Sequence, residues 1–322
     1  MAEGGLVDTL IFGSGNLIPS QNNNQYQYNW PGGMKLKNAK IAIKNISIPY
    51  SWANIKGAYG NNVYQIKWPL TQLTGTTCSM STFTVTMPDG FYQFVDSNQF
   101  NTYLQQYCLN NGLYLTGTGN TSSQGVTTTA GKVYYFISAQ ANVSYYSIEF
   151  DFFPLPLSAD IAADTSKAYQ RPSGWPTTTT GFTSNFSPQL VVPAVTTQYS
   201  FSTYIGFLPG TYPTNQYTAT NSIVGVQSTF SPQVTPVQGI IVCLSIVSNR
   251  AGLSPNALST IGISNTQFGS NLIYAPGYAW FSKALDGNFN NCILSFYDQN
   301  YVPLPIYDTA INVELGLYLP ST

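Results

Sequence analysis

The sequence predicts an all-β protein, a sandwich or jelly roll with one helix packed on its sheets. Short apolar segments that alternate with polar residues recur along most of the chain. Pro, Gly, Asn and Thr separate these segments at short spacing, as turns between strands require. A single stretch, near residues 96–110, has helical periodicity instead. With 322 residues, the chain has room for one large β domain or two smaller ones.

The N-terminal residues 1–34 are predicted to form an extended arm. Their stretch "IPSQNNNQYQYNWPGG" is more polar and richer in turn residues than a core strand. Residues 35–319 are then predicted to form one jelly-roll unit with an elaborated middle region. Whether this is one jelly roll with an inserted β-subdomain in its second half, or two smaller β-units, stays open at this stage.

The first core strand, "KIAIKNISIP", is predicted to contain a bulge. Ile41 and Ile43 share one side of the strand, whereas Ile46 and Ile48 have the opposite parity. Because strand side chains alternate with a period of two, such a change of phase requires one extra residue. We place that residue near Lys44 and Asn45.

The helix follows the strand "TFTVTM" and the turn "PDG". Asp96 is the predicted N-cap, and Gln99 completes a capping-box pattern with it. Asn111 and Gly112 provide the stop. One apolar stripe at helical spacing consists of Phe100, Tyr103, Leu104, Tyr107 and Cys108. We expect this stripe to lie on a sheet, either covering its face or closing one end of the sandwich.

The remaining elements are predicted to be strands around one long loop. "KVYYFISAQ" and "SYYSIEFDFFPLP" resemble a hairpin, in which Tyr146 and every second residue after it face inward. Residues 156–198 are predicted to be irregular, and a loop of that length is usually functional or an interface. Further strands are expected within residues 198–210, 221–230, 239–250, 272–281, 292–300 and 310–319.

Low charge is the unusual property of the composition. Asp, Glu, Lys and Arg make up 7% of the chain, with 11 basic and 12 acidic residues, whereas a typical soluble domain has roughly 25%. Asn, Gln, Ser, Thr and 24 tyrosines must therefore cover the surface. Such a surface suits contacts between subunits, because little charge has to be desolvated there.

Targeting and redox signals are weak. The sequence has no apolar run long enough to span a membrane and no recognisable secretory signal. The four cysteines, Cys78, Cys108, Cys243 and Cys292, are widely separated, and we expect them to be reduced in a reducing compartment.

Enzymatic chemistry is poorly supported. The chain contains no histidine and no nucleotide-binding GxxxxGK[ST] motif, and its aspartates are dispersed. We expect no catalytic residue, cofactor or metal. Glu149 and Asp151 are the most enzyme-like pair, since their i, i+2 spacing on a strand places both carboxylates on one face, as a glycosidase requires. Charges on the solvent face of a strand are the more common explanation.

One local positive cluster exists. Lys35, Lys37, Lys40 and Lys44 lie within ten positions near the first core strand. They are candidates for weak contacts with nucleic acid or another subunit, because phosphate binding needs little beyond lysine. A solvated strand face is the interpretation that we favour.

The order of several motifs resembles a known family. A strand ending in Ile-Pro leads through "NNVYQIKW" to "TFTVTMPDGFYQFVDSNQFNTYLQQYCLNNGLYL", and a late "FYDQNYVPLP" precedes the terminal strand. This order resembles the jelly-roll penton, or minor capsid, proteins of virophages, polinton-like viruses and polintons. The matching turn residues are Pro88, Asp89 and Gly90, then Asp298, Gln299 and Asn300.

The resemblance implies a structural protein of an icosahedral virion. It implies a homopentamer at the capsid vertex, surrounded by trimers of a major capsid protein and assembled inside the host cell, with a vertex spike or host receptor as a further partner. The alternative is a receptor- or glycan-binding β-sandwich of a spike or fibre head. Nucleic-acid contact is expected to be weak or absent.

Overall fold

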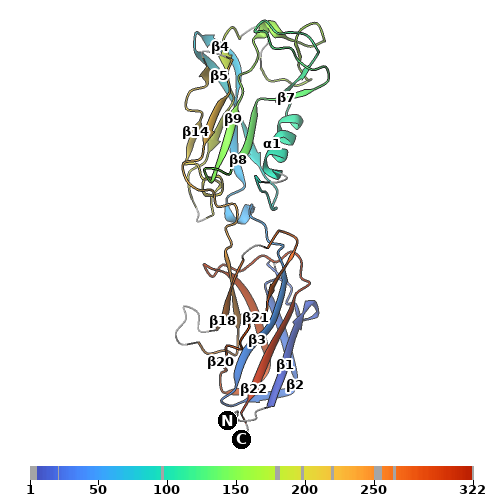
Figure 1. The fold of residues 1–322 in the computed structure, drawn as a ribbon, viewed down its shortest axis with the longest axis vertical. Helices are drawn as coiled ribbons and strands as arrows, with labels where there is room; N and C mark the ends of the chain where they lie inside the picture. Colours follow the sequence, from blue (N-terminus) through green and yellow to red (C-terminus); the bar gives the residue numbers. More distant parts are fainter. Residues whose placement is uncertain are drawn as a thin grey trace. The chain divides into compact units, whose positions relative to one another are not determined.

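The chain folds into two β-rich units in the computed structural model, which describes residues 6–20, 22–95, 98–177, 182–196, 199–218, 221–249, 256–263 and 266–320. Unit 1 comprises Met1–Ala53 and Val237–Thr322, and unit 2 comprises Asn54–Pro236. Unit 2 is thus a continuous segment that interrupts unit 1. Figure 1 shows each unit as layered strands, with helix α1 (Gln99–Asn110) beside the strands of unit 2. The predicted all-β class is confirmed.

Unit 1 is an eight-stranded jelly roll. One antiparallel sheet has the order β1-β22-β3-β19, with β20 also pairing β3, and the other has the order β18-β17-β21-β2. Because β19 and β20 pair successive parts of β3, they share one strand position. The strands pass between the two sheets in the double Greek-key order of a jelly roll. The bounds are β1 (Leu6–Gly13), β2 (Gln25–Leu36), β3 (Lys40–Pro49), β17 (Gly239–Leu244), β18 (Ala257–Gly262), β19 (Asn271–Tyr274), β20 (Ser282–Lys283), β21 (Gly287–Asp298) and β22 (Asn312–Leu319).

Alternating apolar residues hold the two sheets together. On β22, Val313, Leu315 and Leu317 are fully buried, as the alternation of the sequence predicts. Phe12 of β1 contacts Tyr28 of β2 with ring centroids 5.9 Å apart, which joins the inner faces of the two sheets. Unit 2 lies in the connection between β3 and β17.

The predicted bulge in the first core strand is confirmed. On β22, Glu314 pairs with Asn45, while the next residue, Leu315, pairs with Ile43. Lys44 is therefore the extra residue. The bulge lets isoleucines of both parities face the core, since Ile41, Ile46 and Ile48 are all fully buried.

The N-terminal segment is more regular than its composition suggests. Residues 6–13 and 25–36 form β1 and β2, and the side chain of Tyr26 is fully buried, so our expectation that this stretch is too polar for a core strand is wrong. A glycine pair allows it: Gly32 and Gly33, with φ of 86° and 81°, form a bulge that resumes pairing at Met34. On β2, Gln25, Gln27 and Asn29 lie on the side opposite Tyr26.

Unit 2 is built around two sheets and a helix. One sheet has the order β14-β13-β4-β5, and the second has the order β16-β9-β8. Smaller sheets of order β10-β11-β6-β7 and β12-β15 extend them. The bounds are β4 (Val63–Thr74), β5 (Thr77–Thr86), β6 (Tyr114–Gly117), β7 (Val133–Tyr135), β8 (Ile137–Asn142), β9 (Ser147–Phe152), β10 (Ile161–Ala162), β11 (Tyr169–Gln170), β12 (Asn185–Phe186), β13 (Gln189–Val192), β14 (Gly210–Tyr212), β15 (Tyr217–Thr218) and β16 (Val224–Gln227).

Helix α1 (Gln99–Asn110) lies between the edge strands of both sheets. The hydroxyls of Tyr103 and Tyr107 donate to the carbonyls of Thr86 and Thr84 on β5, at 2.9 and 3.0 Å. On its other side, the Asn101 side chain accepts from the backbone N–H of Ala139 on β8 at 2.9 Å. The helix thus satisfies backbone groups on two strand edges.

The apolar stripe of α1 is confirmed, but its N-cap is not the predicted one. Phe100, Leu104 and Cys108 are fully buried. The cap is Asn98, whose side chain accepts from the N–H of Asn101, whereas the predicted cap Asp96 lies outside the described residues.

Three other expectations for unit 2 are corrected. Residues 201–205, predicted to be a strand, form helix α2 (Phe201–Ile205), with Ser200 as its N-cap and Gly206 as its left-handed C-cap. The predicted irregular segment 156–198 contains the short strands β10 to β13. Tyr146 is 80% exposed in the turn between β8 and β9, although the hairpin itself is present.

The domain boundaries predicted from the sequence, an arm of residues 1–34 and a jelly-roll unit of residues 35–319, stay a prediction. The two units seen in the structure follow other boundaries, because β1 and β2 belong to unit 1 and residues 54–236 form unit 2.

Candidate functional site

The Pro88–Gly90 turn stabilises the start of unit 2. The Asp89 carboxylate accepts from the backbone N–H of Gly57 at 2.7 Å, and Gly90 exchanges backbone hydrogen bonds with Ile55. Tyr92 donates its hydroxyl to the carbonyl of Pro88 at 3.1 Å. These contacts close the loop that precedes α1. Their geometry is that of a structural turn.

The Asp298–Asn300 turn does the same in unit 1. Asp298 is 2% exposed, and its Oδ1 accepts from the backbone N–H groups of Asn300 and Val302 at 2.8 and 2.9 Å. The side chain of Gln299 accepts from the N–H of Gln238 at 3.1 Å, just before β17. The two motifs shared with the resembling family therefore belong to different units.

The four predicted lysines are spread over both sheets of unit 1 and the turn between β2 and β3. Lys35 lies on β2, whereas Lys40 and Lys44 lie on β3 in the other sheet. Lys44 donates to the hydroxyl of Thr9 at 2.7 Å. The register instead places Lys40 directly opposite Lys283 of β20, a residue that the sequence did not single out.

The carboxylates of Glu149 and Asp151 share one face of β9, as predicted. Both face Gly225 of β16, where an added Cβ would lie 2.8 Å from Glu149 Oε1 and 3.4 Å from Asp151 Oδ1. Gln140 donates to Asp151 Oδ2 at 3.1 Å. Burial, and then the charge of Glu149, raises the pKa of Asp151. The pair is a polar strand face with amide partners.

Unit 2 contains an aromatic pocket of about 460 Å³. Its lining residues are Ser122, Gln124, Val126, Lys132, Tyr134, Tyr135, Phe136, Phe153, Pro154, Pro156, Tyr169, Asn221 and Ile223. The rings of Tyr134 and Tyr169 meet edge to face with centroids 5.5 Å apart. A mostly apolar lining with a few polar groups is typical of small-molecule sites. Neither the helix stripe nor the strand alternation indicated this pocket.

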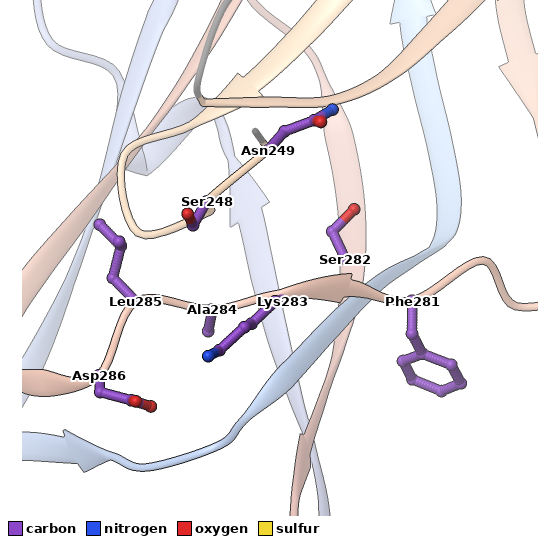
Figure 2. A pocket seen from close by; sticks show the side chains of 8 residues that line it. All are labelled: Ser248, Asn249, Phe281, Ser282, Lys283, Ala284, Leu285 and Asp286. Carbon is purple, nitrogen blue, oxygen red and sulfur yellow. The ribbon is translucent and has the colours of Figure 1, made fainter. Parts of the chain in front are cut away.

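Unit 1 contains a more open hollow of about 670 Å³ beside β20. Figure 2 shows Ser248 and Asn249 on one segment and Phe281–Asp286 on the other, with Phe281 and Lys283 pointing to the side away from Asn249. The preceding loop exposes Tyr278 and Trp280, at 83% and 79%. Our prediction of a continuous strand over residues 272–281 is wrong, since β19 ends at Tyr274. The signal that was available is the run of aromatic residues in "APGYAWFSK".

Metal and thiol chemistry finds no support in the described residues. That part of the chain contains no group of three or more Cys, Asp or Glu side chains placed to hold a metal ion. The four cysteines are buried and reduced. Burial raises the pKa of Cys108 and of Cys292 to about 12. Among the described residues, no helix is both long and apolar enough to cross a bilayer.

Comparisons with known proteins give one distant structural likeness. No family model matches the sequence, and no curated protein matches it. The structure is similar to the crystal structure of the selenomethionine-labelled mavirus penton protein, with 12% identity, a TM-score of 0.42 and 98% of each chain covered. At this identity and TM-score, we base no functional argument on the likeness.

Proposed function

We propose that this chain is a structural protein of an icosahedral virus capsid that forms pentameric capsomers at the five-fold vertices. The observation that supports the proposal most directly is the strand order of unit 1, an eight-stranded jelly roll. Viral capsid proteins, lectins and cupins share this architecture. Because a fold does not determine a function, these classes have to be distinguished by the properties of the protein surface.

The surface favours contacts with other protein subunits. Ile11, Ile273 and Tyr307 of unit 1 are 52 to 70% exposed, in a chain with 7% charged residues. Exposed apolar groups surrounded by uncharged polar residues are typical of interaction surfaces. The motif order that resembles the penton family supports the same class, since Asp89 and Asp298 each hold a turn that the resemblance predicts.

The exposed edges of the sheets in unit 1 explain why copies of the chain would associate. In unit 1, β1 and the β19–β20 position end one sheet, and β18 and β2 end the other. Edge strands present backbone groups to which other chains bind. In the proposed pentamer, neighbouring copies cover these edges, and trimers of a major capsid protein surround the ring. The proposed location is therefore the vertex of a virion assembled inside the host cell.

The native mass of the purified protein tests this proposal. Native mass spectrometry at moderate salt is expected to give a five-fold multiple of the 35.1 kDa chain mass. A stable trimer contradicts the vertex role. A monomer that also fails to join capsid shells assembled from the major capsid protein contradicts it as well.

The aromatic pocket of unit 2 favours a second candidate function, binding of a receptor glycan. Tyrosine rings such as Tyr134 and Tyr169 offer flat apolar faces, and Gln124 and Asn221 contribute amide groups to the lining. A calorimetric titration with a panel of neutral sugars tests this function. Tyr134→Ala is expected to abolish the signal, and Tyr145→Ala, at a residue that is 72% exposed in another turn, is expected to leave it unchanged. The absence of any heat with the wild-type protein rejects it.

A further inference from the structure

On the outer face of unit 1, two lysines lie directly opposite each other. Lys283 of β20 is the register partner of Lys40 on β3, and Tyr318 of β22 is the partner of Lys40 on its other side. Residues paired across strands project their side chains to the same face, with Cβ atoms about 5 Å apart. Both lysines are exposed. Like charges placed directly opposite each other destabilise a strand pair.

Neither ammonium group is neutralised by the part of the chain that the structure describes. The nearest carboxylate along the chain, Asp286, lies three residues after Lys283 and accepts from the backbone N–H of Asn38 at 2.7 Å. Glu314 lies four residues from Tyr318 along β22. In a chain with 11 basic residues, an exposed lysine pair without a carboxylate partner is a site that an anion would stabilise.

Aromatic rings border the lysine pair. Phe281 precedes Lys283 by two residues, and its ring contacts Tyr318 with centroids 6.2 Å apart. Figure 2 shows Phe281 and Lys283 on the same side of their segment. Tyr278 and Trp280, in the loop just before, are among the most exposed aromatic side chains described. Lysines beside exposed rings provide both partners that a single-stranded nucleic acid needs, cations for phosphates and flat surfaces for bases.

We propose that this face of unit 1 binds single-stranded nucleic acid. Lys40 and Lys283 contact successive phosphates, and Trp280 and Tyr278 stack on bases. The proposal does not depend on the oligomeric state, so native mass and nucleic-acid binding test different statements.

Fluorescence anisotropy with a labelled 20-nucleotide oligothymidylate tests the site at 50 and 200 mM salt. We expect the wild-type protein to bind at 50 mM salt, and the Lys40→Gln/Lys283→Gln variant to bind at least about ten-fold more weakly. The slope of log affinity against log salt should fall by about 1.4, because each phosphate contact on a single strand contributes about 0.7. Tyr278→Ala/Trp280→Ala is expected to weaken binding by roughly ten-fold with an unchanged salt slope.

The matched control is Lys67→Gln/Lys167→Gln, which removes the same two charges from a half-buried and an exposed position of unit 2. It is expected to keep the wild-type affinity within about two-fold. An equal loss of affinity in the control and in the site variant would show that net charge alone determines binding, and would overturn the proposal. No wild-type binding at 50 mM salt overturns it too, as does binding to phosphatidylcholine vesicles with 30% phosphatidylserine but not to the oligonucleotide. Circular dichroism of each variant confirms that it is folded.

Discussion

Unit 1 and unit 2 are both β-rich, but their cores are built in different ways. Unit 1 is assembled from two distant segments, and aliphatic residues such as Ile46, Val313 and Leu315 fill its interior at alternate strand positions. Unit 2 is one continuous segment around a cluster of aromatic rings, with Phe100 of α1 among them. The first core depends on strand pairing over long sequence distances, and the second on one helix that joins two sheets.

The largest expected effect is the loss of the aromatic centre of unit 2. The Phe100 ring lies 4.6 Å from that of Phe94 and 5.9 Å from those of Tyr64 and Phe150. Phe100→Ala is expected to cost about 3–5 kcal/mol of unfolding free energy, because it removes a fully buried ring and leaves a cavity. Urea denaturation measures the loss. Hydrogen exchange should show it in unit 2 peptides while unit 1 peptides keep their protection.

The matched control for this change is Gln106→Ala on the exposed face of the same helix. It is expected to change the free energy of unfolding by less than about 0.5 kcal/mol. If Phe100→Ala reduced hydrogen-exchange protection equally in both units, the two units would unfold together. The difference between their cores would then not correspond to separate unfolding free energies.

A smaller effect is expected at the two aspartate turns, one in each unit. Asp298→Ala leaves two part-buried backbone N–H groups without their acceptor and is expected to cost unit 1 about 1–3 kcal/mol. Asp89→Ala removes one hydrogen bond from an exposed carboxylate and is expected to cost unit 2 about 0.5–1.5 kcal/mol. Thermal unfolding of both variants measures which substitution destabilises its unit more. Asp298→Asn, which keeps an acceptor oxygen, should recover most of the loss.

The outer face of unit 1 provides a change that stabilises. Lys283→Gln is expected to raise the free energy of unfolding by about 0.2–1 kcal/mol at low salt, because it removes the repulsion from Lys40 across the strand pair. The gain should shrink at 1 M salt through screening. Lys44→Gln is the comparison, and no gain is expected there since Lys44 donates to Thr9. Equal gains at both positions would show that net charge, not the opposed pair, is responsible.

The smallest effect concerns the carboxylates of unit 2 and depends on pH. The folded-state pKa of Asp151 is raised above 3.8, so its contribution to stability is fully present below that pH and is lost as the pH rises through the folded-state pKa. Asp151→Asn is therefore expected to raise the melting temperature slightly at pH 7 and to leave it unchanged at pH 3. Glu149→Gln should change nothing beyond a small stability effect. A hydrolase activity that this substitution abolished would contradict a structural role for the pair.

Much of unit 1 was predictable, because its core strands follow simple alternation. The change of parity between Ile43 and Ile46 located the bulge at Lys44, and the pattern of residues 310–319 located β22. β2 was missed because a polar edge strand that buries a residue such as Tyr26 has little apolar signal. The opposition of Lys40 and Lys283 depends on pairing between residues 243 positions apart, which no local pattern contains.

Unit 2 was predictable at its helix and less so elsewhere. The stripe through Phe100 and Leu104 gave α1 correctly, since helical periodicity over twelve residues is a strong signal. Residues 201–205 were predicted to be a strand because apolar residues dominate a short run, although Ser200 and Gly206 are typical helix caps. The aromatic pocket escaped prediction because its lining comes from segments spread over residues 122–223.

The position of β22 has a consequence for the order in which the protein forms during synthesis. This strand lies between β1 and β3, near the end of the chain, and pairs with both. During synthesis, β1 and β3 therefore each keep an unpaired edge until roughly 270 more residues have been added. At about 5–20 residues per second, this takes tens of seconds. Unit 2 emerges complete within that interval. Nascent chains of this protein should thus carry a folded unit 2 together with an unfinished, aggregation-prone unit 1 until β22 pairs with β1 and β3.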